Sequence, residues 1–334
     1  MSDSSAIINI FKSFERLKVL IIGDVMVDSY IFGNTTRISP EAPIPIVDVY
    51  KKENRLGGAA NVALNVKELG ATPLLCSVVG DDYEGHTFKK HLQFNHIDPA
   101  YIILDQERKT TVKTRVVSRN AQLVRFDSEQ CDPIDTKTEL LLIDNIIDIL
   151  YRTKPHVVIL QDYNKGVLTP KVIASVIYNS NQMEIPVAVD PKKDNFFLYK
   201  GCTLFKPNLK EASDGLATPL NPSRHENLTF ADQQIRAILN NTYTIITLSE
   251  RGIFVGMEGD SEIIPAYVRN ITDVSGAGDT VISMLSLGLA LGLDIFATVE
   301  LANIAAGMVC EKVGVVAVDR SALLKKATAY LSEE

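Results

Sequence analysis

Beyond Asp127 the sequence alternates between short apolar runs and longer segments in which apolar residues recur every three to four positions. Short apolar runs are typical of buried strands, and the longer segments are typical of helices with one apolar face. Strands that alternate with helices of this length indicate a mostly parallel sheet covered on both faces. The expected strands are residues 156–160, 186–189, 203–206 and 244–248, and the expected helices are residues 136–151, 170 onwards, 231–239, 278–291 and 295–313.

The first 127 residues follow this pattern less closely. An apolar run at residues 17–28 predicts a buried central strand. A helix at residues 57–69, a strand at 72–79 and a second helix at 83–94 are expected to follow. Five further strand candidates do not fit the alternation, and we expect them to form a β layer inserted as a lid at residues 29–52 and 99–127. The chain is therefore expected to be one α/β domain over residues 1–334, a doubly wound, mostly parallel sheet with helices on both faces and a small inserted β-sheet lid.

The charge balance and the apolar segments exclude several classes of partner. The chain has 34 Lys and Arg against 41 Asp and Glu, a net charge of −7, so a basic surface for nucleic acid is not expected. The longest relevant uncharged run, residues 280–293, is shorter than the ~18–20 residues that a membrane span needs. The cysteines lack metal-binding spacing, and the N-terminus lacks the pattern of a secretory signal. We therefore expect a cytoplasmic protein with no membrane or nucleic-acid partner.

Two common nucleotide-binding motifs are not supported. Residues 80–87 have the glycine spacing of a P-loop, but His86 stands where that motif requires Lys. No G-x-G-x-x-G follows the first expected strand, which disfavours a nicotinamide-dependent dehydrogenase.

The segment DVSGAGDT at residues 273–280 opens an apolar helix. Gly276 and Gly278 allow close backbone approach, and the backbone N–H groups of Gly276, Ala277 and Gly278 at a helix start form a ready anion site. Asp279 would then stand where a carboxylate can take the proton of a hydroxyl that attacks a phosphoryl group. The alternative is a loop turn in which Asp279 only caps the helix.

A second glycine pair, Gly57 and Gly58, opens an earlier helix that carries Asn61. Such a pair lets a small polar ligand approach the backbone, although plain helix–strand packing is the alternative. Asp24 and Asp28 leave the end of the first expected strand, where open α/β sheets bind ligands. Either could also be a solvated loop carboxylate.

A third motif, KPNLKE at residues 206–211, also follows an expected strand. Its Asn208 and Glu211 could hold phosphate, water or Mg²⁺. Taken alone, the two residues could instead simply cap a helix.

Together these motifs resemble the ribokinase-like, phosphofructokinase-B type sugar kinases in order and approximate spacing, over essentially the whole chain. The resemblance implies an ATP-dependent carbohydrate kinase in which Asp279 is the catalytic base and the amides of Gly276, Ala277 and Gly278 form the anion hole. The sugar contacts that it implies are Asp28, Gly57, Gly58 and Asn61.

The same resemblance implies a nucleotide site for ATP with Mg²⁺. Glu211 would contact Mg²⁺ through water, and a monovalent cation near Asp273 is left open. The nucleotide-binding residues that it implies are Asn208, Glu211, Thr247, Ser249, Gly252 and Asn303.

Other segments resemble a subfamily that phosphorylates D-glycero-D-manno-heptose 7-phosphate at its anomeric hydroxyl, which gives heptose 1,7-bisphosphate for ADP-heptose synthesis. The lid of that subfamily is also a dimer contact, which implies a homodimer. The sequence departs from the pattern at Gln161 and Lys206. The matching segments are residues 37–45 (RISPEAPIP), 57–63 (GGAANVA), 117–122 (VSRNAQ), 162–166 (DYNKG), 190–192 (DPK) and 273–281 (DVSGAGDTV).

A sugar phosphate on a net acidic protein needs local cations or amides. We expect Arg119 and Lys165 to hold the 7-phosphate, with Asn120 and Gln122 as polar helpers and Asp190 also in the substrate site. Two alternatives remain: a kinase of another sugar or sugar phosphate, such as ribose, fructose or a phosphohexose, and a non-catalytic sugar-binding homologue.

Overall fold

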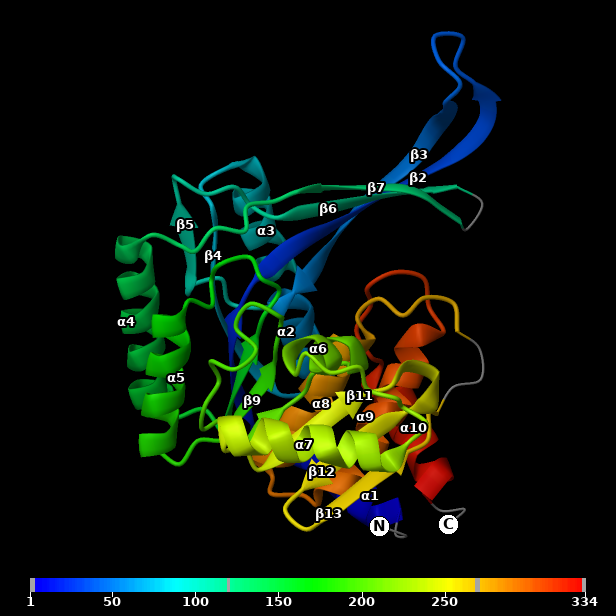
Figure 1. Cartoon of the computed structure of the whole chain (residues 1–334). Helices are drawn as coiled ribbons and strands as arrows, with labels where there is room; N and C mark the ends of the chain where they lie inside the picture. Colours follow the sequence, from blue (N-terminus) through cyan, green and yellow to red (C-terminus); the bar gives the residue numbers. More distant parts are fainter. Residues whose placement is uncertain (1–3, 119–120, 268–270, 332–334) are drawn as a thin grey trace.

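In the computed structural model, which describes residues 4–118, 121–267 and 271–331, the expected strands meet in a nine-stranded sheet (Figure 1). Six of its eight strand pairs are parallel, and the two pairs at the β13 edge are antiparallel. In spatial order its strands are β13 (Asp260–Ile264), β12 (Ile253–Met257), β11 (Tyr243–Thr247), β10 (Leu204–Phe205), β9 (Val187–Asp190), β8 (Val157–Gln161), β1 (Lys18–Gly23), β4 (Thr72–Gly80) and β5 (Ile102–Asp105).

Helices cover both faces of this sheet. In β1, Val19 and Ile21 pack into one apolar core, whereas Leu20 and Ile22 pack into the other, because successive strand residues point to opposite faces. None of the described helices is long and apolar enough to cross a membrane. The helices of the first core are α1 (Ser4–Phe14), α2 (Ala59–Glu68), α3 (Tyr83–Phe94), α8 (Ala277–Ala290), α9 (Ile295–Cys310) and α10 (Arg320–Leu331), and those on the other side are α4 (Thr136–Thr153), α5 (Pro170–Gln182) and α7 (His225–Leu239).

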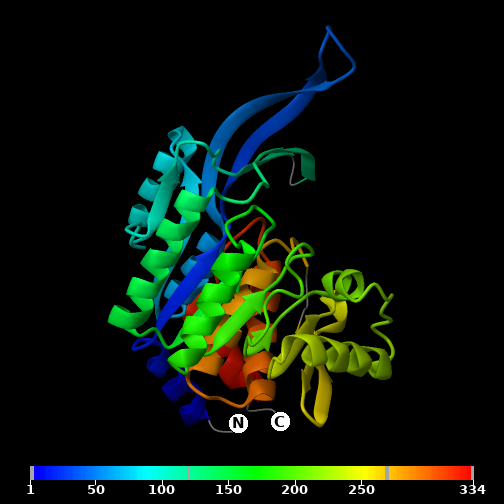
Figure 2. The ribbon, with the colours of Figure 1, turned by 60° about the vertical axis from the view of Figure 1, so that its left-hand side comes forward.

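A separate four-stranded sheet forms the lid, in the order β3–β2–β6–β7. Figures 1 and 2 show its long hairpin projecting away from the main sheet. Every residue of β7 is exposed. The strands of the lid are β2 (Val25–Ile38), β3 (Pro45–Gly58), β6 (Val112–Ser118) and β7 (Ala121–Ser128).

The lid boundaries differ from the expected segments. Residues 102–105, expected in the lid segment 99–127, form β5 and pair in parallel with β4 at the edge of the main sheet. The other lid segment, expected at 29–52, is longer in the structure, because β2 and β3 pair with each other from Val25 and Gly58 out to Ile38 and Pro45. A four-residue strand has too short a pattern to reveal which sheet it joins.

The carboxyl ends of β1, β8 and β9 meet at one edge of the main sheet. Gly23 pairs with Gln161, and Gln161 pairs with Asp190 in the next strand. Ligands of open α/β sheets bind outside the carboxyl ends of the strands, so this edge is the expected position of a functional site.

Candidate active site

Asp279 lies in the first turn of α8, above this edge. The helix begins after Gly276, which adopts a left-handed conformation with φ 84°, so Asp279 is not the residue that caps the helix. Its carboxylate is buried and accepts hydrogen bonds from three side chains on two other segments. The donors are Asn61 Nδ2 to Oδ2 at 2.7 Å, Tyr163 OH to Oδ1 at 2.7 Å and Gln161 Nε2 to Oδ1 at 3.2 Å.

Burial raises the pKa of Asp279 from 3.8 to about 6. The hydrogen bonds from Asn61 and Tyr163 oppose this rise in pKa, as does the positive charge of Lys206, whereas the negative charge of Asp190 adds to it. A carboxyl with a pKa of about 6 is ionised at pH 7 and is still basic enough to accept a proton. The site can therefore perform general base chemistry.

The glycine pair makes room for the carboxylate of Asp28 and for the backbone carbonyl of Asp24. A Cβ atom on Gly57 would lie 2.1 Å from Oδ2 of Asp28, and one on Gly58 would lie 2.4 Å from the backbone oxygen of Asp24. Asp28 is buried and forms an ion pair with Arg115 of the lid. Although the charge of Arg115 opposes it, burial raises the pKa of Asp28. The glycines thus bring the base of the lid against α2.

A pocket of about 380 Å³ lies beside the N-terminus of α8. This volume is in the range of small-molecule sites. Asn303 lines the pocket, and its side chain also bonds to the backbone of Pro265 and Tyr267, which holds the neighbouring loop. Expected site residues in the lining are Thr247, Ser249, Gly252, Ala277, Gly278 and Asn303, and apolar neighbours are Val274, Val281 and Ala306.

Asn208 and Glu211 form a reciprocal cap at the start of α6 (Leu209–Gly215). Asn208 Oδ1 accepts from the Glu211 N–H, and Glu211 Oε2 accepts from the Asn208 N–H, both at 2.8 Å. The other carboxylate oxygen of Glu211 bonds to the ammonium of Lys192. Each oxygen thus accepts one donor and keeps a further acceptor position that a metal-bound water could occupy. Across the described residues, no three His, Cys, Asp or Glu side chains gather into a metal site.

The structure adds three site residues to which the sequence assigned no role, Gln161, Tyr163 and Lys206, and it places Lys192 beside them. The Lys192 ammonium lies 5.4 Å from the centre of the Tyr163 ring. Although burial opposes its charge, Asp190 and Glu211 raise the pKa of Lys192. Gln161 ends β8, and the other three follow strand ends. In the sequence, their positions at or just after the carboxyl ends of expected strands could have identified them as candidates.

Of the residues expected to hold a sugar phosphate, the structure describes Lys165 and Gln122. Lys165 Nζ lies 2.8 Å from Glu129 Oε1, at the junction of the lid and the core. Gln122 is exposed on β7. Arg119 and Asn120 lie outside the described residues.

Asp24 fixes the loop that carries Tyr163 and Lys165. Its carboxylate accepts the backbone N–H groups of Tyr163, Lys165 and Val167 at 2.8–3.0 Å. Burial, followed by the charge of Asp162, raises the pKa of Asp24 to about 6. Asp24 is therefore a buried structural carboxylate, not a solvated one.

Asp273, expected near a monovalent cation, receives two backbone donors. Ser275 N–H bonds to Oδ1 and Gly314 N–H bonds to Oδ2, both at 2.9 Å. Burial opposes ionisation, but these donors and the charge of Arg115 together lower the pKa of Asp273. The Asp273 carboxylate therefore joins the loop before α8 to the segment that follows α9.

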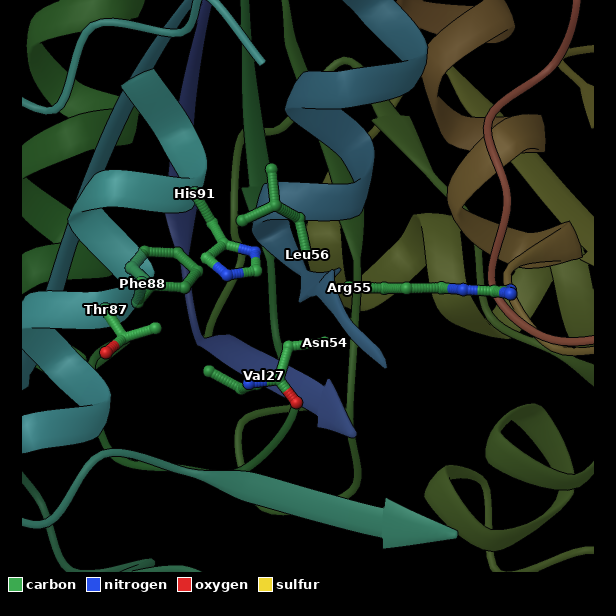
Figure 3. Close-up of a pocket in the computed structure, with 7 residues that line it drawn as sticks. All are labelled: Val27, Asn54, Arg55, Leu56, Thr87, Phe88 and His91. Carbon is green, nitrogen blue, oxygen red and sulfur yellow. The ribbon is translucent and has the colours of Figure 1, made fainter. Parts of the chain in front are cut away.

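A hollow between β3 and α3 lies at the base of the lid (Figure 3). Leu56 of β3 faces Phe88 and His91 of α3, whereas Arg55 points the opposite way, as strand alternation requires. Arg55 Nη1 donates to the backbone oxygens of residues 313 and 315, both at 3.1 Å. The hollow leaves no space for a water molecule, so it is packing and not a ligand site.

Comparison with known proteins places these features in a family. Residues 16–321 match the family described as pfkB family carbohydrate kinase. The bifunctional protein HldE of Trichlorobacter lovleyi is 40% identical over 314 residues, which cover 93% of this chain and 63% of that protein. HldE of Campylobacter jejuni subsp. jejuni serotype O:6 is 42% identical over 306 residues, which cover 91% and 63%. The chain thus spans about 63% of the length of these relatives.

Solved structures show the same fold at low sequence identity. Phosphofructokinase-2 from Escherichia coli in complex with potassium has a TM-score of 0.78 and 16% identity, and the match covers 95% of this chain and 99% of that one. Ribokinase from Arabidopsis thaliana, complexed with ribose and ATP, has a TM-score of 0.71 and 14% identity, with coverage of 93% and 98%. The fold is ribokinase-like.

Proposed function

The chain belongs to the pfkB family of carbohydrate kinases, and we propose that it transfers the γ-phosphoryl group of ATP to the anomeric hydroxyl of D-glycero-D-manno-heptose 7-phosphate. The observation that carries the kinase chemistry is Asp279, a buried carboxylate at a helix N-terminus beside the nucleotide-sized pocket. The segments at 37–45 and 117–122, which are not general features of sugar kinases, support the heptose assignment. The product would be heptose 1,7-bisphosphate, for ADP-heptose synthesis.

The hydrogen bonds of Asp279 leave a position for the attacking hydroxyl. A carboxylate offers about four acceptor positions. Among the described residues, Oδ1 receives two donors and Oδ2 receives one, from Asn61. Oδ2 therefore keeps a free acceptor position, and we assign it to the substrate hydroxyl.

In the proposed reaction this hydroxyl gives its proton to Asp279 as its oxygen attacks the γ-phosphorus. The bond from that phosphorus to the departing ADP oxygen breaks, and the negative charge passes to ADP. Amides at the N-terminus of α8, from Gly276 to Gly278, stabilise the charge on the transferring group. Mg²⁺, when bound, neutralises charge on the ATP phosphates, and Glu211 would contact it through water.

For the 7-phosphate we propose Arg119 and Lys165, with Asn120 and Gln122 as polar partners. Lys165 is bonded to Glu129, so phosphate would have to compete with a carboxylate for its ammonium. The remaining substrate contacts that we propose are Asp28, Gly57, Gly58, Asn61 and Asp190.

Release of ADP, measured over a panel of sugars, tests the proposed function. The panel contains heptose 7-phosphate, unphosphorylated heptose, ribose, fructose and fructose 6-phosphate, with Asp279→Asn as the inactive control. We expect the highest kcat/KM on heptose 7-phosphate. A higher value on another sugar would leave only the general sugar-kinase assignment, and no ADP release with any sugar would favour a non-catalytic homologue.

The phosphate assignment is tested with Arg119→Ala. Hydrogen bonds to charged groups contribute roughly 1.5–3 kcal/mol each, so kcat/KM on heptose 7-phosphate should fall about ten- to hundredfold. The KM for ATP and the residual activity on unphosphorylated heptose should change little. Arg125→Ala is the matched control, because Arg125 is an exposed arginine on the neighbouring strand β7. An equal loss on both sugars would contradict the assignment.

A further inference from the structure

Lys206 and Gln161, the two departures from the family pattern, meet at Asp190. Lys206 Nζ lies 2.9 Å from Asp190 Oδ2, and Gln161 Nε2 lies 3.2 Å from the same oxygen. Gln161 Nε2 also lies 3.2 Å from Asp279 Oδ1. All four side chains are more than nine-tenths buried. A continuous polar chain therefore runs from the Lys206 ammonium to the carboxylate that we assign as the base.

The geometry of this chain is set by the fold. Gln161 and Asp190 are paired residues at the ends of β8 and β9, so the sheet register holds them side by side. A Cβ atom on Gly278 would lie 3.7 Å from Lys206 Nζ and 3.9 Å from Asp190 Oδ2. The ion pair thus packs directly against the first turn of α8, which carries Asp279.

The orientation of the Gln161 amide follows from its partners. Both partners are carboxylates, which accept hydrogen bonds when ionised, so the amide must turn its NH₂ group toward them. Its Oε1 atom is then buried with no hydrogen-bond partner among the described residues. A buried unpaired acceptor is unfavourable, so the two bonds from Nε2 must outweigh that loss.

We propose that Lys206 and Gln161 are positioning residues that hold the Asp279 carboxylate in the orientation and charge state that proton transfer requires, Gln161 by its direct bond to Asp279 and Lys206 through Asp190. This inference rests on the proposed role of Asp279 as the base. It gives Asp190 a structural task beside Asp279, in addition to the substrate contact proposed above.

The charges explain why the three residues act together. Asp190 raises the pKa of Asp279 and Lys206 lowers it, so the ion pair places two opposing influences beside the base. The other titratable groups that face this carboxylate are Tyr163, which donates to it, and Lys192, which interacts with it electrostatically. Loss of Lys206 alone would leave two buried carboxylates linked by one amide.

The test follows the titration of Asp279 in the free protein by ¹³C NMR of side-chain carboxyls, with Asp279→Asn to assign the resonance. Because the positive charge of Lys206 lowers the pKa of Asp279, Lys206→Met should raise the midpoint by about one unit. Asp190→Asn should lower the midpoint. The double variant, Lys206→Met with Asp190→Asn, should return it to within about 0.3 units of wild type, since the two effects oppose each other.

A buried ion pair elsewhere provides the matched control. Arg236 pairs with buried Asp232 at 2.9 Å, outside the site. Arg236→Met should destabilise the protein as loss of a buried pair does, but it should leave the Asp279 midpoint unchanged.

Gln161 is tested separately, because its removal changes no charge. Gln161→Met should lower kcat about tenfold with little change in the KM for sugar, since the base loses one of its orienting donors.

The titration requires no substrate, so its outcome is independent of whether heptose 7-phosphate is the sugar. If neither Lys206→Met nor Asp190→Asn moves the Asp279 midpoint, or if both variants move it in the same direction, the inference is wrong. If the midpoints move as expected but Asp279→Asn keeps its turnover, the network stands and the proposed function fails.

Discussion

Asp279 carries its negative charge with only 4% of its surface exposed to water. Three neutral side chains donate hydrogen bonds to it in place of water molecules. Replacement by Asn keeps the size of the side chain and removes the base. We expect turnover to fall by about 10²–10⁴, while ATP and sugar still bind, as measured by calorimetry. Near-normal turnover would show that Asp279 has only a structural role.

The raised pKa of Asp279 predicts the acid side of the pH–rate profile. The base works only when ionised, and its pKa is about 6, so kcat/KM should be level above pH 7 and fall about tenfold per unit well below pH 6. The profile is measured with a buffer series at constant ionic strength. Full activity at pH 4.5 would contradict this prediction.

The same shift in pKa has a consequence for stability. A carboxyl whose pKa rises from 3.8 to about 6 on folding favours the folded state in its neutral form, and that contribution is lost as the pH rises through 6. Asp279→Asn is neutral at every pH, so we expect the difference in stability between the variant and wild type to shift in favour of the variant by about 1–3 kcal/mol from pH 4 to pH 8. Denaturation of both proteins at pH 4 and at pH 8 checks this.

At the scale of elements, a substitution at the start of α6 can distinguish the structural role of Glu211 as a helix cap from its proposed role in catalysis. Glu211→Gln keeps an acceptor for the Asn208 N–H and removes the charge. We expect a higher magnesium requirement and lower turnover, with the KM for sugar and the melting temperature almost unchanged. Magnesium titrations of initial rates measure the effect.

The matched control for this helix cap is Thr169, which caps α5 through its hydroxyl. Thr169→Ala should lower stability by about 1 kcal/mol without a change in the magnesium requirement. If Glu211→Gln behaves like Thr169→Ala, the motif at residues 208–211 is only a helix cap.

At the scale of the whole molecule, the lid presents apolar side chains and two strand edges. Exposed sheet edges pair readily with other strands. We propose a homodimer formed through the lids, and we expect sedimentation velocity to show a dimer at micromolar concentration. Phe126→Lys on β7 should give a monomer. The exposed apolar residues of the lid include Ile38, Val49, Tyr50, Leu123, Val124 and Phe126.

The control for the dimer is Tyr178→Lys, because Tyr178 is also an exposed aromatic residue but lies on α5, outside the lid. This variant should remain dimeric. A wild-type protein that is monomeric and fully active at the same concentration would overturn the proposal.

The sequence alone determined the local elements, because their signals are local. The helix expected at 83–94 has those bounds, and the one expected at 278–291 lies at Ala277–Ala290. Apolar spacing and residues such as Asp82, which caps the helix at 83, act within a few positions of the chain. The same holds for the motifs that place Gly276 and Asp279 at a helix start.

Only the tertiary structure decided which of these local pieces meet. Residues 102–105 join the main sheet and not the lid, Lys165 pairs with Glu129, and Gln161 contacts Asp279 at a separation of 118 residues. Strand register and packing between distant segments set these partners, and no short-range pattern records them. The sequence therefore located the candidate base, whereas the fold determined which groups contact its carboxylate and shift its pKa.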